Sequence, residues 1–285
     1  MIRTLPQGSV YRFGYRAYIL AYFAFLFAPL VVTCILAFND SQFPALPWKG
    51  FTLEWFFGDL PHRIGIFNDR VNLDSIWVSF QVAFGVTLAA TLVGTCAAFL
   101  FEQEEFPGKP LLYFLMLAPL VIPGVILGIS ILLFANSLGL YFENRWGLDI
   151  ALFRPGFWLV VLGQFAFITT LVTLIVSARL RKFDRTLEEA AMNLGAGRLA
   201  VIWHITLKYL RPAIIGGAAV AFLMSFENFN TTLFLVGSET TLPINLYLQV
   251  RDGSTPVINA ISFLLIVGTS LAAVANLYFS RSRER

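Results

Sequence analysis

Charged residues, cysteine and histidine are all scarce in this 285-residue sequence. Only 13% of the residues are charged, while 58% are hydrophobic and the mean hydropathy is +0.74. The two cysteines, Cys34 and Cys96, each lie inside an apolar run, which excludes a disulfide scaffold or a cysteine metal site. His62 and His204 have no second ligand or nucleophile nearby, so they indicate neither a metal site nor catalysis. The chain has more apolar surface than one soluble core can bury, and we therefore expect a lipid bilayer around it.

Six apolar segments are long enough to cross the hydrocarbon core as helices, which takes about 20 residues. They cover residues 17–38, 76–101, 111–135, 156–177, 212–236 and 257–280. The first segment is longer than a signal-peptide core and has no small-residue cleavage site, so we expect a retained span. The sequence thus predicts an all-helical, polytopic membrane protein with one transmembrane domain over residues 1–285.

The positions of lysine and arginine predict which way the chain crosses the membrane, because these residues accumulate on the cytoplasmic side. Fourteen of the 20 lie in the N-terminus, in the loops 102–110 and 178–211, and in the tail. Both termini are therefore expected in the cytoplasm. The net charge of +3 gives no reason to expect nucleic acid as a partner.

Two loops are long enough to have structure of their own. The external one, residues 39–75, is rich in aromatic residues that suit an element at the membrane interface: Trp48, Phe51, Trp55, Phe56 and Phe57. The internal one, residues 178–211, is the most basic stretch of the chain. No internal repeat is evident, which lowers the weight of an inverted-repeat carrier.

The internal loop contains a short amphipathic helix by its sequence pattern. Thr186 and Glu189 have the spacing of a capping box, and Gly195 is suited to a left-handed C-terminal cap. A small apolar stripe between them consists of Leu187, Ala190, Ala191 and Leu194. The helix is expected to last about three turns. A second amphipathic stretch, residues 198–209, leads to Pro212, and its apolar side contains Leu199, Ile202, Trp203 and Ile205. From these residues alone, an interfacial anchor is an equal alternative to a docking helix.

The same residues resemble a known motif. The string Glu189-Ala190-Ala191-x-x-Leu194-Gly195-Ala196, followed by Ile205-Thr206-Leu207 and Pro212, resembles the EAA loop of permease subunits in binding-protein-dependent ABC importers. Lys208 departs from the proline usual in that family, so any bend there needs another cause. The resemblance implies the MetI-like fold of type I importer permeases in the bacterial inner membrane. It also implies that Glu189, Ala190, Ala191, Leu194, Gly195 and Ala196 dock on an ATPase.

The resemblance further implies the partners of the chain. They are a second permease, which we expect to form a heterodimer with this chain, two ATPase subunits, an external substrate-binding protein and membrane lipid. ATP and Mg²⁺ would be used by the ATPase, and no cofactor is expected in this chain, which has no G-x-x-x-x-G-K-[ST] phosphate loop. We therefore expect a non-catalytic subunit.

Four stretches narrow the resemblance to the PotC type of spermidine/putrescine importer permease. They are Trp48-x-Gly50-Phe51-Thr52-x-x-Trp55, Phe106-x-Gly108-Lys109, the EAA loop, and Ser225-Phe226-Glu227-Asn228-Phe229. Leu242-Pro243 and Asn259-Ala260 add to it. Subunits that import ferric ion, aminophosphonates or opine-like compounds share parts of this pattern and stay as alternatives.

Glu227 is the one acidic residue among 17 that falls inside a predicted span. A carboxylate at that depth is costly and is functional by default. Asn230 and Thr231 follow at i+3 and i+4 on the predicted helical face, Asn228 is adjacent, and Gln164 of the fourth span could face the same cavity. Glu227 and Asn230 are hypothesised to line a path for a cationic substrate. The alternatives are that Glu227 pairs with the partner permease, or is protonated and serves packing.

The interrupted third span and the rival function classes leave alternatives to be weighed. Pro119, Pro123, Gly124 and Gly128 interrupt the third span, where either a gate hinge or a fixed, tightly packed bend fits, and the fixed bend is favoured. A proton-coupled secondary transporter using Glu227 is the strongest rival on chemistry, but it has no use for an ATPase-docking helix. A membrane enzyme is disfavoured because one buried acid has no second ionisable group in the spans.

Overall fold

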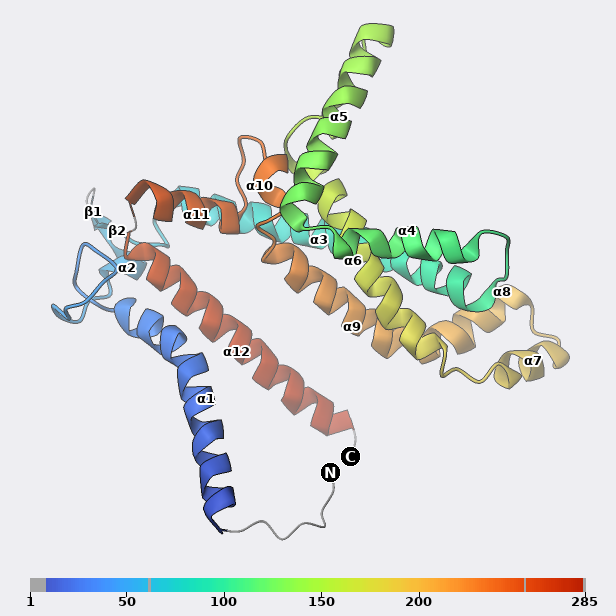
Figure 1. The fold of residues 1–285 in the computed structure, drawn as a ribbon, viewed down its shortest axis with the longest axis horizontal. Helices are drawn as coiled ribbons and strands as arrows, with labels where there is room; N and C mark the ends of the chain where they lie inside the picture. The colour runs from blue at the N-terminus through green and yellow to red at the C-terminus, as the bar shows by residue number, and fades with distance from the viewer. Residues whose placement is uncertain (1–8, 61–62, 254, 284–285) are drawn as a thin grey trace. The chain divides into compact units, whose positions relative to one another are not determined.

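The computed structural model describes residues 9–60, 63–253 and 255–283 (Figure 1). His62 therefore lies outside the described residues. The chain divides into two compact units, Met1–Leu73 with Leu248–Arg285, and Asp74–Tyr247. Nearly all of the described chain is helical, apart from the two-residue strands β1 (Asp59–Leu60) and β2 (Arg63–Ile64). The all-helical prediction is confirmed.

The first unit contains the first and last long helices of the chain, α1 (Ser9–Leu36) and α12 (Val257–Arg283). The two helices contact each other, and Phe38, just beyond α1, packs edge-on against Phe263 of α12 with ring centroids 4.9 Å apart. Most of the apolar side chains of α1 are exposed, as expected of a helix whose natural solvent is lipid.

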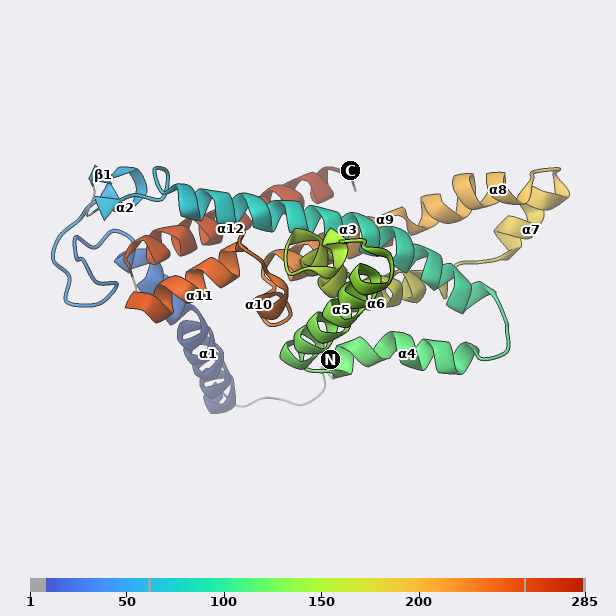
Figure 2. The same cartoon turned by 90° about the horizontal axis from the view of Figure 1, so that it is seen from above.

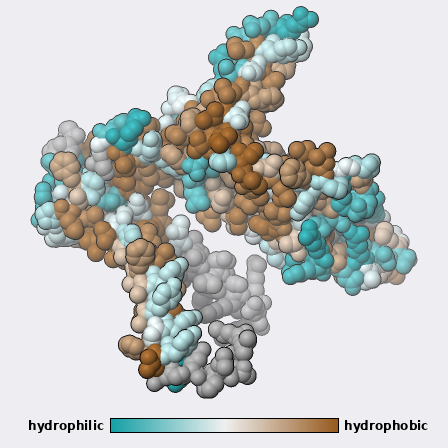
Figure 3. Space-filling model, in the orientation of Figure 1, coloured by the Kyte–Doolittle hydropathy of each residue, from teal (hydrophilic) through white to brown (hydrophobic). Residues whose placement is uncertain are grey.

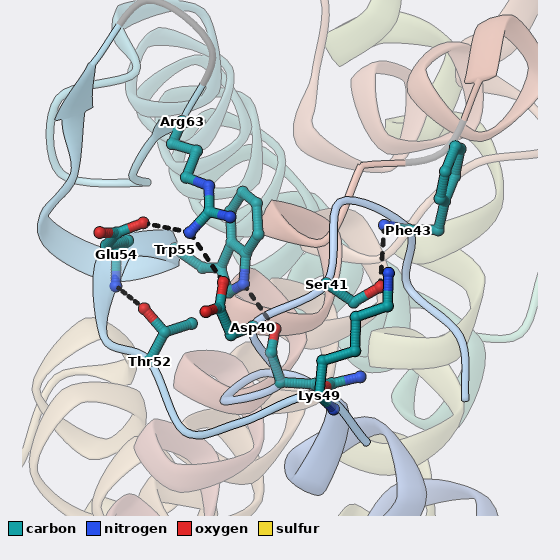
Figure 4. Close-up of polar contacts among 9 residues, drawn as sticks. Asp40, Ser41, Phe43, Lys49, Thr52, Glu54, Trp55 and Arg63 are labelled. Atoms are coloured by element: carbon teal, nitrogen blue, oxygen red, sulfur yellow. Dashed lines mark hydrogen bonds and ion pairs between the residues drawn. The ribbon is translucent and has the colours of Figure 1, made fainter. Parts of the chain in front are cut away.

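The segment after α1 folds into a small polar cluster (Figure 4). The Arg63 guanidinium donates to Asp40 at 2.7 Å and to Glu54 at 2.5 Å. Both hydrogen bonds raise the pKa of Arg63, and the bond to Glu54 has the larger effect. The Trp55 indole N–H donates to the Asn39 carbonyl at 2.8 Å. Trp55 and Phe56, in the short helix α2 (Glu54–Phe57), are buried inside this segment, whereas Trp48, Phe51 and Phe57 are exposed. The position of the segment at the membrane interface stays a prediction.

The second unit is built around α6 (Phe157–Leu180), the most buried of the long helices. Val172 of α6 is fully buried between α3 (Arg70–Gln103) and α9 (Leu207–Phe226). A Cβ built on Gly94 of α3 would lie 3.0 Å from the Val172 side chain, and one on Gly217 of α9 would lie 3.4 Å from it. Small residues on both neighbours therefore allow close helix packing, as is common between membrane helices.

Five helices of the described chain are long and apolar enough to span a bilayer. They cover Val10–Leu36, Arg70–Gln103, Gly124–Trp146, Phe157–Leu180 and Arg198–Phe226, and two shorter apolar helices cover Lys109–Val121 and Val257–Leu271. The predicted sixth span, residues 257–280, lies within α12. The apolar helix that the described side chains support covers only Val257–Leu271. Helix lengths alone thus do not confirm the number six.

The predicted third span, residues 111–135, is wrong as one helix. It is divided into α4 (Lys109–Val121) and α5 (Gly124–Trp146), which point in different directions in Figures 1 and 2. Pro123 lacks an N–H and forces the preceding Ile122 into an extended conformation with ψ of 128°. α4 is only about 20 Å long, so α5 is the helix that can span.

The predicted fifth span, residues 212–236, is wrong at both ends. Its helix begins at Arg198 and continues through α8 (Arg198–Val201), the π-helical segment η2 (Ile202–Thr206) and α9 as far as Phe226. The chain then leaves the helix over residues 227–231 and resumes in α10 (Thr232–Leu235). The following α11 (Leu242–Gly253) was not predicted, and its first residue, Leu242, donates its N–H to the Ser79 hydroxyl of α3 at 2.7 Å.

Candidate functional site

The internal loop forms the helix α7 (Thr186–Asn193), as expected, but with a different N-terminal cap. Asp184 accepts hydrogen bonds from the Thr186 N–H at 3.0 Å and from the Thr186 hydroxyl at 2.8 Å, which lowers the pKa of Asp184. The predicted capping box of Thr186 and Glu189 is therefore wrong, because a carboxylate two residues earlier satisfies the free amide instead. The Glu189 side chain is exposed.

The C-terminal end of α7 follows the prediction closely. Gly195 has φ of +92°, its N–H donates to the Met192 carbonyl at 2.9 Å, and the Ala196 N–H donates to the Ala191 carbonyl at 3.1 Å. This pair of bonds is a Schellman motif, which needs a residue that adopts positive φ without strain. The helix has eight residues, so it is shorter than the three turns expected.

The apolar stripe of α7 has no cover within the described chain. Leu194 is 90% exposed, Leu187 is 52% exposed, and no residue of α7 is buried. Ala190 is exposed and Ala191 is partly exposed. On the second stretch, Leu199 and Trp203 of the predicted apolar side are also exposed, whereas Val201 and Thr206 are buried. The π-helical segment η2 lies just before Lys208, where the family has proline, and supplies a local irregularity of the helix at this point.

The loop predicted at residues 102–110 contacts the loop around α7, a pairing that the sequence analysis did not predict. We give the name acidic loop to residues 102–109, which comprise the last two residues of α3, the connection, and the first residue of α4. Glu102 accepts both Arg181 Nε and Nη2 bonds, at 2.8 to 2.9 Å, and its backbone carbonyl accepts from Arg185 at 2.7 Å. Glu104 accepts from Arg198 at 3.2 Å. The sequence did show three acidic residues in this loop and seven basic residues within residues 178–211. It could not show which of them pair.

The membrane-embedded candidate site centres on the helix break at residues 227–231. Gln164 of α6 is fully buried; it donates to the Thr232 hydroxyl at 2.8 Å and accepts from the Ser225 hydroxyl. The Thr232 hydroxyl in turn donates to the Asn228 amide oxygen at 2.9 Å, which also accepts the Thr232 N–H at 3.3 Å. Within this neutral network the Asn228 amide oxygen satisfies one backbone N–H beside the break, that of Thr232, and the other bonds join side chains to one another.

The five predicted path residues therefore separate into two groups. Gln164 and Thr231 are buried, and Asn228 is half-buried within the network. Glu227 and Asn230 are exposed, and among the described residues none forms a hydrogen bond or ion pair with the Glu227 carboxylate. Asn230 and Thr231 do not lie at i+3 and i+4 on a helix, because the helix ends at Phe226. Gln164 is fully buried and supports the break through its bonds to Ser225 and Thr232, whereas the Glu227 side chain is exposed.

The helix α5 packs on the break through two glycines. A Cβ on Gly128 would lie 2.7 Å from the Thr231 carbonyl oxygen, and one on Gly124 would lie 3.0 Å from the Asn230 Cβ. In this structure the interrupted third span is thus a close-packed bend, in line with the favoured alternative.

Comparison with known proteins now decides the family. Residues 90–284 match the family described as binding-protein-dependent transport system inner membrane component. The chain belongs to this family. It is a permease subunit of an ABC importer, a multi-pass transport component of the inner membrane, and members of this family act with a further permease, an ATPase and a binding protein.

Two relatives from Escherichia coli K12 cover nearly the whole permease. The putrescine transport system permease protein PotI is 33% identical over 92% of this chain and 89% of its own length. The spermidine/putrescine transport system permease protein PotC is 26% identical over 98% of this chain and 97% of its own. The predicted resemblance to the PotC type is confirmed.

The fold has a close structural counterpart. A bacterial ABC transporter involved in the import of the acidic polysaccharide alginate contains a chain with a TM-score of 0.73, covering 94% of this permease and 93% of that chain. At 16% identity, this likeness establishes the fold of an importer permease and carries no information on the substrate.

Proposed function

We propose that the permease carries a polyamine, such as putrescine or spermidine, across the membrane, with Glu227 and Asn230 on the substrate path. The observation that carries the proposal is the exposed Glu227 carboxylate, which pairs with no residue in the described part of the chain and follows directly on the end of α9. The names of PotI and PotC support an amine as the substrate. Aminophosphonates, opine-like compounds and ferric ion are the alternatives that the experiment below separates.

The physical argument concerns what can lie next to this carboxylate. Irregular backbone at membrane depth is tolerated only where protein buries it or where it lines a water-filled cavity. Gln164, Ser225 and Thr232 bury one side of the break, whereas Glu227 and Asn230 lie on the exposed side. A primary ammonium group can donate one charge-assisted hydrogen bond to the Glu227 carboxylate and another to the Asn230 amide oxygen. Thr231 and Asn228 fix the backbone that presents these two groups.

The coupling part of the proposal rests on α7. Leu187, Met192 and Leu194 are all about half or more exposed, and α7 lies in a largely hydrophilic part of the surface (Figure 3). An exposed apolar patch of this kind is typical of a protein interface. Docking of Glu189, Ala190, Ala191, Leu194, Gly195 and Ala196 on the ATPase gives that patch a partner, and the small side chains permit close approach.

The remaining assignments follow the same proposal. The permease forms a heterodimer with a second permease, two ATPase subunits bind ATP and Mg²⁺ on the cytoplasmic side, and this chain is non-catalytic and binds no cofactor. Both termini lie in the cytoplasm, which the distribution of lysine and arginine supports.

The test uses the permease purified with its co-encoded partner subunits and reconstituted in liposomes. ATP hydrolysis is measured with binding protein loaded with putrescine, spermidine, an aminophosphonate, an opine-like compound or ferric ion. Stimulation by the amines alone is expected. Stimulation by another compound alone would show that this compound, and not a polyamine, is the substrate. If no loaded binding protein stimulates hydrolysis, the assignment of the reconstituted complex as an importer is contradicted.

A substitution then tests the path. Glu227→Gln is expected to lower amine uptake about tenfold, the loss of one charge-assisted hydrogen bond. Glu239→Gln, which removes another exposed carboxylate of the same unit, is the control and should leave uptake unchanged. Unchanged uptake and substrate profile in Glu227→Gln would sink the role of Glu227.

A further inference from the structure

The acidic loop binds the loop around α7 at three points that bracket the helix. Arg181 and Arg185 precede α7 and both bind Glu102, the first through its side chain and the second through its carbonyl oxygen. Arg198 follows the C-terminal cap of α7 and binds Glu104. Glu102 is the best-buried partner, with a side chain only 14% exposed, and it holds Arg181 in a fork geometry that fixes orientation as well as distance.

The other end of the acidic loop is tied to α4. The Lys109 ammonium group, at the start of α4, donates to the Glu104 carbonyl at 2.9 Å and to the Glu105 carboxylate at 2.7 Å. Hydrogen bonding to Glu102 raises the pKa of Arg181, with a smaller contribution from Tyr113 of α4. The acidic loop therefore joins α7 to the ends of α3 and α4. Neither helix is next to the EAA loop in the sequence.

We propose that Glu102 is a positioning residue through which movement of α7 reaches α3 and α4. The inference rests on the proposed function, because it assumes that an ATPase moves α7. Beyond α4, the chain passes Pro123 into α5, whose Gly124 and Gly128 pack on the break at residues 230–231. Displacement of α7 thus reaches the substrate-path break by a route through α4 and α5, in addition to the direct one through α9. Energetic coupling along such a route requires proof by substitution, not by contact alone.

The experiment compares variants in the reconstituted complex, with uptake and ATP hydrolysis measured on the same liposomes. Glu102→Gln is expected to retain the ATPase subunits and basal hydrolysis but to lower substrate transported per ATP about fivefold or more, the usual scale of a coupling free energy. Glu239→Gln is the control, because Glu239 is an exposed carboxylate that lies outside the acidic loop and the loop around α7.

A charge exchange separates positioning from simple structural damage. Glu102→Arg alone should uncouple transport from hydrolysis, and Glu102→Arg combined with Arg181→Glu should restore most of the transport per ATP. If the role of Glu102 were only structural, the substitutions would change assembly of the complex and the basal rate of ATP hydrolysis. We expect both to stay unchanged in the double variant. Unaltered transport per ATP in Glu102→Gln, or no recovery in the double variant, would overturn the inference.

The outcomes also separate this inference from the proposed function. A wild-type complex that no loaded binding protein stimulates would contradict the proposed function, and the role of Glu102 with it. A wild-type complex that is stimulated by amines, together with a Glu102→Gln variant that transports equally well per ATP, would overturn only the role of Glu102.

Discussion

The membrane break and the loop around α7 are both polar, but they are held by different chemistry. At the break, Gln164, Ser225, Thr232 and Asn228 form a neutral network in which the central groups are buried. Around α7, Arg181, Arg185 and Arg198 pair with the acidic loop, and all three arginines are exposed. Buried neutral groups are costly to leave unpaired, whereas exposed ion pairs contribute little stability. The neutral network is therefore expected to contribute more to stability than the arginine contacts around α7.

The largest expected effect on stability is at the centre of the neutral network. Gln164→Leu leaves the buried Ser225 hydroxyl without its acceptor, while the Thr232 hydroxyl keeps its bond to Asn228, and we expect a loss of about 1–3 kcal/mol in the free energy of unfolding. Thermal unfolding of the purified complex in detergent measures this. Thr169→Val is the control, since the Thr169 hydroxyl bonds to Phe165 of its own helix, and a loss there as large as for Gln164→Leu would argue against a special role for the network.

The next effect tests the packing of α5 on the break. Gly128→Ala places a methyl group 2.7 Å from the Thr231 carbonyl oxygen, so backbone has to move, and we expect a loss of about 1–3 kcal/mol. Gly216→Ala, also in a helix but with open space around the added methyl, should be neutral or slightly stabilising. Equal unfolding temperatures for both variants would mean that α5 does not constrain the break.

At α7 we expect a change in binding without a change in stability. Leu194 is 90% exposed, so Leu194→Ala should alter the free energy of unfolding by no more than about 0.5 kcal/mol. If α7 docks on the ATPase, the same variant should weaken ATPase binding about tenfold, a loss of the size seen at interface anchors. Co-purification at graded detergent and salt concentrations checks this. Leu199→Ala, at 83% exposure outside the motif, should bind as the wild type does.

The smallest effect concerns the cap of α7. Because hydrogen bonds from Thr186 lower the pKa of Asp184, the cap is fully present above the ordinary aspartate pKa of about 4 and fades as the pH falls through the lower value in the folded state. Hydrogen exchange of the Thr186 amide, corrected for its intrinsic pH dependence, should therefore lose protection severalfold in acid. Asp184→Asn keeps the acceptor oxygen and should abolish that pH dependence. If protection of the Thr186 amide in the wild-type chain does not depend on pH, the charge of the Asp184 carboxylate has no role in the cap.

The sequence predicted local features well where a single residue type decides the conformation. Gly195 is the clearest case, since the motif it closes needs positive φ. Prediction was wrong where hydropathy continues through a change of direction, as at Pro123 and after Phe226, because a window of apolar residues cannot show that the backbone turns. The Asp184 cap and the Glu102 pairs were missed because they depend on which polar groups meet in space. Glu227 was found because an acid is rare in an apolar run, but its helical setting was wrong.

The central claim, that α7 couples this permease to a separate ATPase, is tested most directly by site-specific photocrosslinking. A photoreactive residue is placed at Leu194 of the assembled complex in membranes, and a second one at Leu199 as the control. We predict that Leu194 gives an adduct with the ATPase subunit whose yield changes when ATP is added. Adducts of Leu194 with lipid alone, in a complex that retains its ATPase, would contradict the account and make α7 an interfacial anchor.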